Sequence, residues 1–321
     1  MSKLYRYTGD DLGVVNYTTP EMFGAVGDGV TDDTAAIQAV ADVGGLILFD
    51  GNKTYKTTAV IRLKQNTELD LNGATIHSTV IHLFFNFLDT STATGYTGEG
   101  NITIKNGRII GGAISFAHAK GVLLDNIQFA ECLNDHYIET AGCQDFTIRN
   151  CSFSGMANLQ SSVYEYINVD LCRYSAFPHL PYAQRESAFY DNSKCDGLTV
   201  DGCKFSLGSG AYAYGYNAFG VHFAPVVDTR HTKIVLTNNE VRGFTGCGFR
   251  INDMQDVYIA NNRIEADGDG IRLGDVEAVD KVIIVDNYVT SANGQKLVRT
   301  TDRYANLTVS GNTTAGMTQD F

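Results

Sequence analysis

The 321-residue chain has no tryptophan, only 4 prolines and no run of about 18 apolar residues that could span a membrane. Basic residues are also scarce: 24 Lys and Arg face 36 Asp and Glu, so the net charge is −12. Nucleic acids demand basic patches, and this balance therefore argues against a nucleic-acid partner. Residues 1–7 have neither the apolar core nor the cleavage site of a signal peptide, so an extracellular role would need another route, such as release of virus particles.

A short phrase, apolar-x-apolar-x-Asn/Gly/Asp-x-x-apolar, recurs nine times. Its alternation predicts a short strand, and the fifth residue predicts a bend, because Asn, Gly and Asp tolerate left-handed backbone angles. A fixed period of roughly 20–50 residues indicates a solenoid, here an all-β parallel β-helix rather than amphipathic helical repeats. One gap of 52 residues, about two periods, suggests that a coil between 153 and 198 lacks the phrase. The copies are Leu69–Ile76, Ile102–Ile109, Val122–Phe129, Phe146–Phe153, Leu198–Phe205, Ile234–Val241, Val257–Ile264, Val282–Val289 and Leu307–Thr314.

The seven cysteines form no Cys-x-x-Cys pair, and their odd number without an export signal predicts free thiols. Cys143 and Cys195 both lie three residues before a phrase, and Cys151 and Cys203 both take its sixth place. With one coil lacking the phrase between them, the members of each pair would lie two coils apart. That separation is roughly 10 Å, too far for a disulfide.

The chain divides into three predicted parts. Residues 1–22 form an N-terminal linker or attachment segment, 23–45 a capping turn and helix, and 46–321 the parallel β-helix domain. In the capping part, Thr31 or Asp32 can cap the helix and Gly44 fits its end. An amphipathic helix here would cover the open end of the solenoid.

Phe23–Val40 closely resembles the opening of the pectate-lyase-like superfamily of right-handed β-helices, which includes phage tailspikes and related glycan depolymerases. Residues 18–22 look like the phage branch, in which a linker joins a virion-attachment region to the β-helix. Tyr164–Asp170 and Tyr190–Cys195 are similar to domains of phage preneck appendage proteins that attack Gram-positive cell-wall polymers. The resemblance implies a single-stranded right-handed coil and a homotrimer on a virion tail, made in the host cytoplasm and acting extracellularly.

Counting back seven positions from the phrase predicts one column of side chains on one face of a sheet. Tyrosine-containing insertions at Arg173–Ser187 and Leu207–Asn217 would wall a groove beside it, although an ordinary solvated face is the alternative. In order along the axis, the predicted column holds Ser115, Glu139, Asn168 or Asp170, Asp191, His222, Arg250, Arg272 and Arg299.

The column changes from acidic to basic, which favours a depolymerase of a bacterial surface glycan that hydrolyses internal glycosidic bonds with paired carboxylates. Glu139 with Asp170 would suit a retaining mechanism, and Glu139 with Asp191 an inverting one. Neither a cofactor nor a metal is required by this hypothesis. The catalytic candidates are Glu139, Glu165, Asp170, Asp191 and His222, and the substrate-binding candidates are Asn168, Arg173, Tyr182, Arg185, Tyr212, Tyr214, Arg250 and Arg272.

Three alternatives stay open. A polysaccharide lyase would use Arg250 or Arg272 as base, with calcium held by Asp170 and Asp191. A teichoic-acid phosphodiesterase would use the same carboxylates and His222, with the arginines on phosphate. A non-catalytic receptor protein would only bind the glycan.

Overall fold

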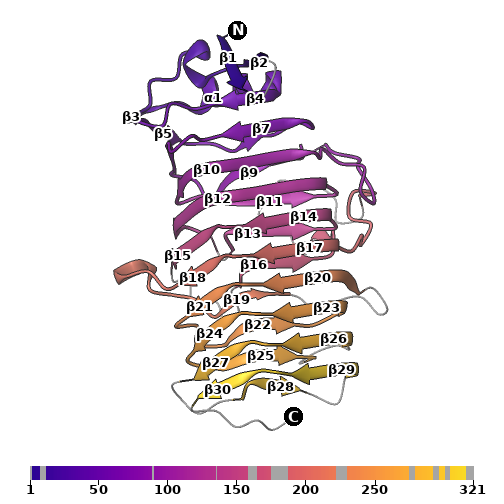
Figure 1. Ribbon diagram of the computed structural model, residues 1–321. Coiled ribbons are helices and arrows are strands. Elements are labelled where there is room, and N and C mark those ends of the chain that lie inside the picture. The colour runs from indigo at the N-terminus through magenta and orange to yellow at the C-terminus, as the bar shows by residue number, and fades with distance from the viewer. Residues whose placement is uncertain are drawn as a thin grey trace.

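The computed structural model describes residues 2–7, 12–88, 90–134, 136–157, 165–174, 187–221, 230–274, 279–291, 296–300 and 304–315. Their strands stack coil upon coil into an elongated rod, with β1 at one end and β30 at the other (Figure 1). Each coil contributes strands to three parallel sheets, and every strand pairs with its counterpart in the next coil. The predicted parallel β-helix is confirmed.

The three sheets are named here in the order that the chain visits them. Sheet 1 holds β4 (Gly45–Leu48), β7 (Thr67–Asp70), β14 (Gln144–Arg149), β17 (Asp196–Asp201), β20 (His231–Thr237), β23 (Met254–Ala260), β26 (Val279–Val285) and β29 (Tyr304–Ser310). Sheet 2 holds β3 (Asp28–Asp32), β5 (Thr54–Thr57), β8 (Thr75–Ser78), β15 (Ser152–Met156), β18 (Lys204–Ser206), β21 (Glu240–Arg242), β24 (Arg263–Ala266), β27 (Tyr288–Ser291) and β30 (Thr313–Ala315). The long strands β10 (Ile102–Ile110) and β12 (Lys120–Cys132) bend and contribute to both.

Sheet 3 carries the predicted polar column. Its strands are β6 (Ile61–Arg62), β9 (His82–Phe85), β11 (Ala113–Ala117), β13 (Ile138–Ala141), β16 (Glu165–Asp170), β19 (Asn217–Gly220), β22 (Cys247–Ile251), β25 (Asp269–Leu273) and β28 (Val298–Thr300).

The bend between sheets 1 and 2 is made by the fifth residue of the phrase, as predicted. All nine of these residues have positive φ, from 54° at Asn150 to 99° at Gly73. Such angles favour Asn, Asp and Gly, so the repeated residue type fixes the corner of every coil. Constant corners keep the apolar positions inside, where Phe129, Phe153 and Phe205 stack with ring centroids 4.8 and 4.9 Å apart.

A ladder of asparagines runs inside this corner, at the sixth place of the last four phrases; the first three are buried and the last is half-buried. In each step an asparagine Oδ1 accepts the backbone N–H of the asparagine one coil before, at 2.9 Å. The ladder continues to the backbone N–H of Cys203, which donates to Asn239 Oδ1 at 2.9 Å. It therefore satisfies buried backbone groups that the tight corner leaves outside the sheets. Its members are Asn239, Asn262, Asn287 and Asn312.

The prediction of a coil without the phrase is wrong. Phe146 of β14 pairs directly with Leu198 of β17, so the 52-residue gap is one coil enlarged by its loops. The cysteine pairs consequently lie in adjacent coils, and the Cys143 backbone N–H donates to Cys195 Sγ at 3.4 Å. All seven cysteines are buried free thiols, as predicted.

The N-terminal end is covered by helix α1 (Thr34–Val43), which follows the short helix η1 (Pro20–Phe23). Its N-cap is Asp33 rather than the predicted Thr31 or Asp32, and it ends at Gly44, as expected. Its own side chains Ile37 and Val40 are fully buried against the core, so the helix covers the open end of the β-helix. The antiparallel pair β1 (Ser2–Tyr7) and β2 (Leu12–Tyr17) precedes this cap. The three-part division of the chain stays a prediction.

Replacing Asn262 by Ala should lower the free energy of unfolding by about 3 kcal/mol, because several buried hydrogen-bonding groups in the coils before and after it would lose their partner. Denaturant unfolding monitored by circular dichroism would measure the change. The control Asn52→Ala, at an exposed turn, should change stability by less than about 0.5 kcal/mol. Equal stability of the two variants would show that the ladder contributes little.

The thiols should be inert in the native protein. Burial raises the pKa of Cys195 to about 12 and that of Cys143 well above its usual value, so the reactive thiolate is scarce near neutral pH. Ellman's reagent at about pH 8 should find no reactive thiol before unfolding and seven afterwards. Rapid reaction of the folded protein would contradict this burial.

Candidate functional site

Strand pairing places the predicted polar residues of sheet 3 in one column. Ser115 pairs with Glu139, and Glu139 pairs with Asn168. Further along, Arg250 pairs with Arg272 and Arg272 with Arg299. Asn168 pairs with Gly220, which lies beside Arg250 because Phe219 pairs with Phe249. The shared column is confirmed for these residues, and Gly220 occupies the place predicted for Asp191 and His222.

A second polar column, missed in the sequence, lies three residues before the first. Glu165 pairs with Asn217, Asn217 with Cys247, and Cys247 with Asp269. His136 belongs here too, since Ile138 pairs with Ile167 two residues later. The signal is a repeated spacing of three positions, visible in His136–Glu139, Glu165–Asn168, Asn217–Gly220, Cys247–Arg250 and Asp269–Arg272.

The two columns meet at a buried cluster of His136, Glu139 and Glu165, called here the acid cluster. The His136 ring lies between the two carboxylates: Nε2 is 3.8 Å from Glu139 Oε2, and Nδ1 is 4.0 Å from Glu165 Oε2. Nδ1 also donates to the Glu165 carbonyl oxygen at 2.8 Å, which leaves Nε2 facing Glu139. Glu139 is 4% exposed and Glu165 is 0% exposed.

Polar neighbours hold both carboxylates in place. Asn168 Nδ2 donates to Glu139 Oε2 at 2.9 Å. Asn217 Nδ2 donates to Glu165 Oε1 at 3.0 Å, and Arg250 Nη1 lies 3.5 Å from the same oxygen. Gly220 makes this meeting possible, because a Cβ there would lie 3.1 Å from Glu165 Cγ and 3.0 Å from Arg250 Cβ.

The other ion pairs of sheet 3 join residues close in sequence or residues of neighbouring coils. Asp170 accepts from Arg173 Nη2 at 3.1 Å. Asp269, 1% exposed, accepts from Arg272 Nη2 at 3.1 Å and from Arg299 Nε at 2.6 Å. Buried carboxylates are costly unless paired in this way.

The acid cluster has the groups that proton transfer requires. Two carboxyl groups from neighbouring coils and one imidazole are grouped with the guanidinium of Arg250, which favours an ionised carboxylate beside it. No group of three or more His, Cys, Asp or Glu residues within the described ranges is arranged to hold a metal ion. The expectations about calcium and other cofactors stay predictions.

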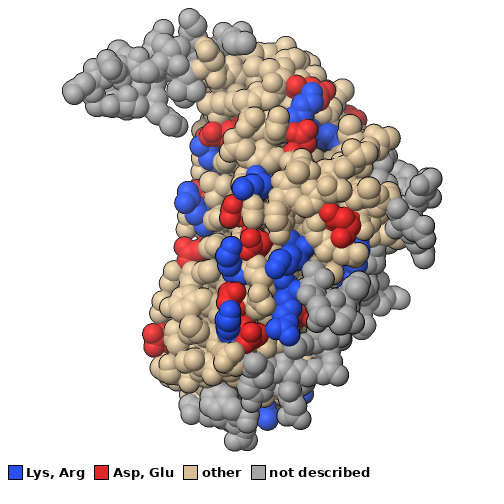
Figure 2. Space-filling view, turned by 90° about the vertical axis from the view of Figure 1, so that its right-hand side faces the viewer, with Lys and Arg blue, Asp and Glu red and all other residues tan. Residues whose placement is uncertain are grey.

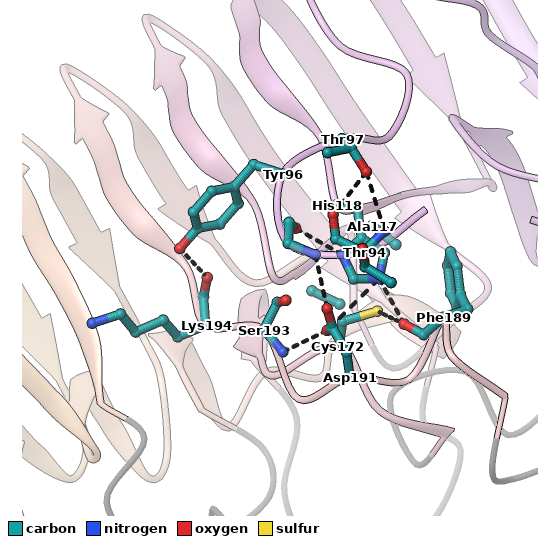
Figure 3. Close-up of polar contacts among 12 residues, drawn as sticks. Thr94, Tyr96, Thr97, Ala117, His118, Cys172, Phe189, Asp191, Ser193 and Lys194 are labelled. Atoms are coloured by element: carbon teal, nitrogen blue, oxygen red, sulfur yellow. Dashed lines mark hydrogen bonds and ion pairs between the residues drawn. The ribbon is translucent and has the colours of Figure 1, made fainter. Parts of the chain in front are cut away.

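Asp191 does not lie in the column, which corrects the prediction. Counting back from the phrase fails because Asp191 sits in the loop between β16 and β17 (Figure 3). Its Oδ2 accepts the Gly95 backbone N–H, and its Oδ1 accepts the Ser193 backbone N–H, both at 2.8 Å. It therefore joins two loops, residues 86–101 and 187–195, that are distant in sequence.

The fully buried side chain of His118 reinforces this junction. Its Nδ1 lies 2.7 Å from the Gly95 carbonyl oxygen and its Nε2 lies 2.6 Å from that of Phe189 (Figure 3). Both ring nitrogens therefore lie within hydrogen-bond distance of backbone carbonyl oxygens of the two loops. Asp191 Oδ1 lies 4.0 Å from Nε2.

The loops border sheet 3 on its two edges. Tyr212 lies in helix η3 (Gly210–Tyr212), in the loop from sheet 2, which projects on the left of Figure 1. Tyr214 packs partly against the core, and its carbonyl oxygen accepts from Tyr166. The other loop joins β16 of sheet 3 to β17 of sheet 1, and its residues 175–186 lie outside the described residues. Three predicted site residues, Tyr182, Arg185 and His222, lie outside the described residues.

The charged side chains on the outer face of sheet 1 differ from the buried ones of sheet 3, because they form partly exposed ion pairs. Basic and acidic side chains mix along the rod's length in Figure 2, and on this sheet they pair between coils. Examples are Lys105 with Glu68 at 2.6 Å, Arg149 with Asp125 at 2.8 Å and Lys233 with Asp196 at 3.0 Å. These partly exposed pairs are screened by water and contribute little, so they indicate an ordinary solvated face.

A family model described as "Right handed beta helix region" matches residues 181–314. The chain is a right-handed parallel β-helix. Crystal structures agree: the surface adhesin PfbA of Streptococcus pneumoniae has a TM-score of 0.78 at 21% identity, covering 93% of this chain and 78% of that one. A tailspike protein variant of E. coli bacteriophage HK620, in complex with a pentasaccharide, has a TM-score of 0.64 at 14% identity, covering 97% and 61%.

Curated relatives share sequence with this β-helix. "Plasmin and fibronectin-binding protein A" of Streptococcus pneumoniae is 26% identical over 76% of the chain and 38% of its own length. The "Depolymerase, capsule K30/K69-specific" of Klebsiella phage K64-1 is 31% identical over 44% of the chain and 18% of its own length. The resemblance to the phage depolymerase branch is thus confirmed, while the chain spans well under half the length of these relatives. No helix in the described ranges is long and apolar enough to cross a membrane.

Asp191→Asn tests whether Asp191 fastens loops or performs catalysis. Partial burial alone would raise the pKa of Asp191, but hydrogen bonds involving Ser193 and Gly95 outweigh it and hold the pKa below its usual value. A lowered pKa contributes stability that is present above the unfolded value near 4 and is lost as the pH falls through the folded pKa. The variant should therefore be less stable than wild type at pH 7, and the difference should shrink below about pH 4.

Thermal unfolding across this pH range measures the effect. Asp256→Asn, the same change at an exposed site, should leave stability nearly unaltered. Unchanged stability of Asp191→Asn together with lost glycan cleavage would instead restore the catalytic role predicted from the sequence.

Proposed function

We propose that this β-helix is the glycan-cleaving part of a phage tail protein and that it hydrolyses internal glycosidic bonds of a bacterial surface polysaccharide. The observation that carries the proposal is the acid cluster, with His136 within 4.0 Å of both Glu139 and Glu165. The similarity to a capsule-specific phage depolymerase and to a tailspike that holds a pentasaccharide supports the class of substrate.

Glycoside hydrolysis requires one protonated carboxyl group to donate to the leaving oxygen and one carboxylate as nucleophile or base. We assign the carboxylate role to Glu165, because Arg250 and Asn217 stabilise its negative charge. Glu139 is then the acid, and His136 Nε2 faces it. A proton can therefore be supplied within the cluster.

The arginine column suits an anionic glycan. Arg250, Arg272 and Arg299 follow one another in successive coils, about 4.8 Å apart, and their side chains become more exposed, at 12%, 19% and 45%. Guanidinium groups bind carboxylates and phosphates through paired hydrogen bonds. We infer that uronate, pyruvate or phosphate groups of the polymer bind along this column.

Attachment to the tail of a virion and assembly as a homotrimer are parts of the same proposal. The likeness to a tailspike supports the first, and the resemblance of residues 18–22 to phage linkers agrees with it. Synthesis in the host cytoplasm is consistent with seven free thiols. The measured mass in solution would test the trimer.

A non-catalytic binding role is the second candidate. Of the two relatives reported above, the one that matches more of this chain is named for binding plasmin and fibronectin, and the surface adhesin has the higher TM-score of the two structures reported above. In that case the acid cluster would be structural and the polymer would keep its length. Lyase and teichoic-acid phosphodiesterase chemistry would shorten it but leave different ends.

Glu139→Gln and Glu165→Gln, made separately, should each reduce cleavage by about 100-fold or more, since each removes a group that transfers a proton or attacks the sugar. Size-exclusion chromatography of purified capsular polysaccharides and teichoic acids would measure chain shortening. The control Glu265→Gln, at a surface ion pair of sheet 2, should keep full activity.

The new chain ends identify the reaction. Reducing sugar supports hydrolysis, an ultraviolet-absorbing double bond indicates a lyase, and glycerol phosphate indicates a phosphodiesterase. Full activity of both cluster variants would refute the assignment, and binding without shortening of any polymer would favour the adhesin-like role.

A further inference from the structure

A cavity of about 730 Å³ lies at the N-terminal end of sheet 3, away from the acid cluster. Its walls are helix α1, strand β6 with the turn that follows it, and the loop 86–99. This volume falls within the range of roughly 300–1,000 Å³ that is usual for small-molecule sites. Nothing in the proposed catalytic chemistry uses it.

The walls of the cavity are tied firmly to the β-helix. Gln38 of α1 accepts the Arg62 backbone N–H at 2.7 Å and donates to its carbonyl oxygen at 3.1 Å. Buried Asn86 donates to the carbonyl oxygens of Glu99 and Ala117 and accepts the Ala117 N–H. The junction of His118 and Asp191 fixes the same loop at Gly95. The cavity is therefore preorganised, which limits the entropy lost on binding.

The residues that line the cavity suit a sugar better than an anion or an apolar ligand. Leu88, which is 58% exposed, offers apolar surface, while Phe87 also lines the cavity but is only 5% exposed. Hydroxyl groups surround it, and Asp42 and Glu99 add carboxylates. The cations Arg62 and Lys64 are matched in number by the carboxylates Asp42 and Glu99, and Lys64 is paired with Asp42 at 3.3 Å, so the lining has no excess of positive charge to attract phosphate. A pyranose has apolar C–H faces and a rim of hydroxyls that match this mixture. The hydroxyl-bearing residues are Thr90, Ser91, Thr92 and Thr97.

The cavity also lies at the N-terminal end of the first polar column of sheet 3, which continues to the acid cluster. Arg62 lines the cavity and pairs with Phe85, Phe85 pairs with Ser115, and Ser115 pairs with Glu139. Three strand steps of about 4.8 Å give a separation of about 14 Å. A ligand that fills both places must be an oligosaccharide of several units.

We propose that this cavity is a second saccharide-binding site, which holds a hexose unit of the glycan several units away from the bond that is cleaved. The inference rests on the proposed function in taking a glycan as ligand. It goes beyond that function because binding in the cavity needs neither Glu139 nor Glu165. The site would make binding depend on chain length and hold the polymer between successive cleavages.

The test compares two exposed threonines of one loop. Thr92 lines the cavity and Thr94 does not, so Thr92→Phe obstructs it while Thr94→Phe is a matched control. The probe is an array of immobilised purified bacterial capsular polysaccharides and teichoic acids, with wild type and Glu139→Gln included. Thr92→Phe should bind at least about tenfold more weakly than wild type to the polymer that wild type binds, and Thr94→Phe within about twofold.

The outcomes separate this inference from the proposed function. Wild-type binding by Thr92→Phe, equal weakening by both threonine variants, or no binding of any polymer by wild type would overturn the cavity site. Weak binding by Thr92→Phe with full cleavage by Glu139→Gln would instead keep the cavity site and reject the catalytic assignment. Melting temperatures of both threonine variants close to wild type would exclude unfolding as the cause.

Discussion

Constant register between neighbouring parallel strands is the constraint on which the rest of this protein depends. A slip of one residue would exchange Phe153, in the core, with Ser152, on the surface. The left-handed residue at each corner prevents such a slip, because it forces every coil to turn at the same place. The asparagine ladder holds these corners together from inside. Fixed corners then turn a sequence spacing into a column of side chains in space.

The fold could be predicted because its signal is local and repeated. Alternation and a residue that tolerates positive φ are read within eight residues, and all nine copies adopt the expected angle. The 52-residue gap was misjudged because loop length carries no such signal. Closing a longer loop costs little additional entropy, so one coil can hold long insertions without losing its strand pairing. The same mistake displaced the cysteine pairs by one coil.

The candidate site could be predicted where strands are regular and not where loops intervene. Counting back from the phrase placed Ser115, Glu139 and Arg250 correctly in one column, and Arg272, which falls close to the same count, belongs to it too. It failed for Asp191, because a loop rather than a strand precedes that phrase. His136 and Asn217 were missed, since only one column was counted. Their spacing of three positions to the first column was visible, but its meaning depends on both positions facing the same side of sheet 3.

The charge balance of sheet 3 distinguishes the acid cluster from ordinary structural pairs. Asp170 with Arg173 and Asp269 with Arg272 and Arg299 each join an acid to at least one guanidinium. The cluster instead groups two glutamates and a histidine with one arginine, Arg250. The His136 ring lies between the two carboxyl groups, within 4.0 Å of an oxygen of each. Apolar residues would stabilise a buried sheet face at least as well. Two carboxyl groups with an imidazole between them are groups that glycoside hydrolysis can use, which makes this cluster the part of the described β-helix most suited to chemistry.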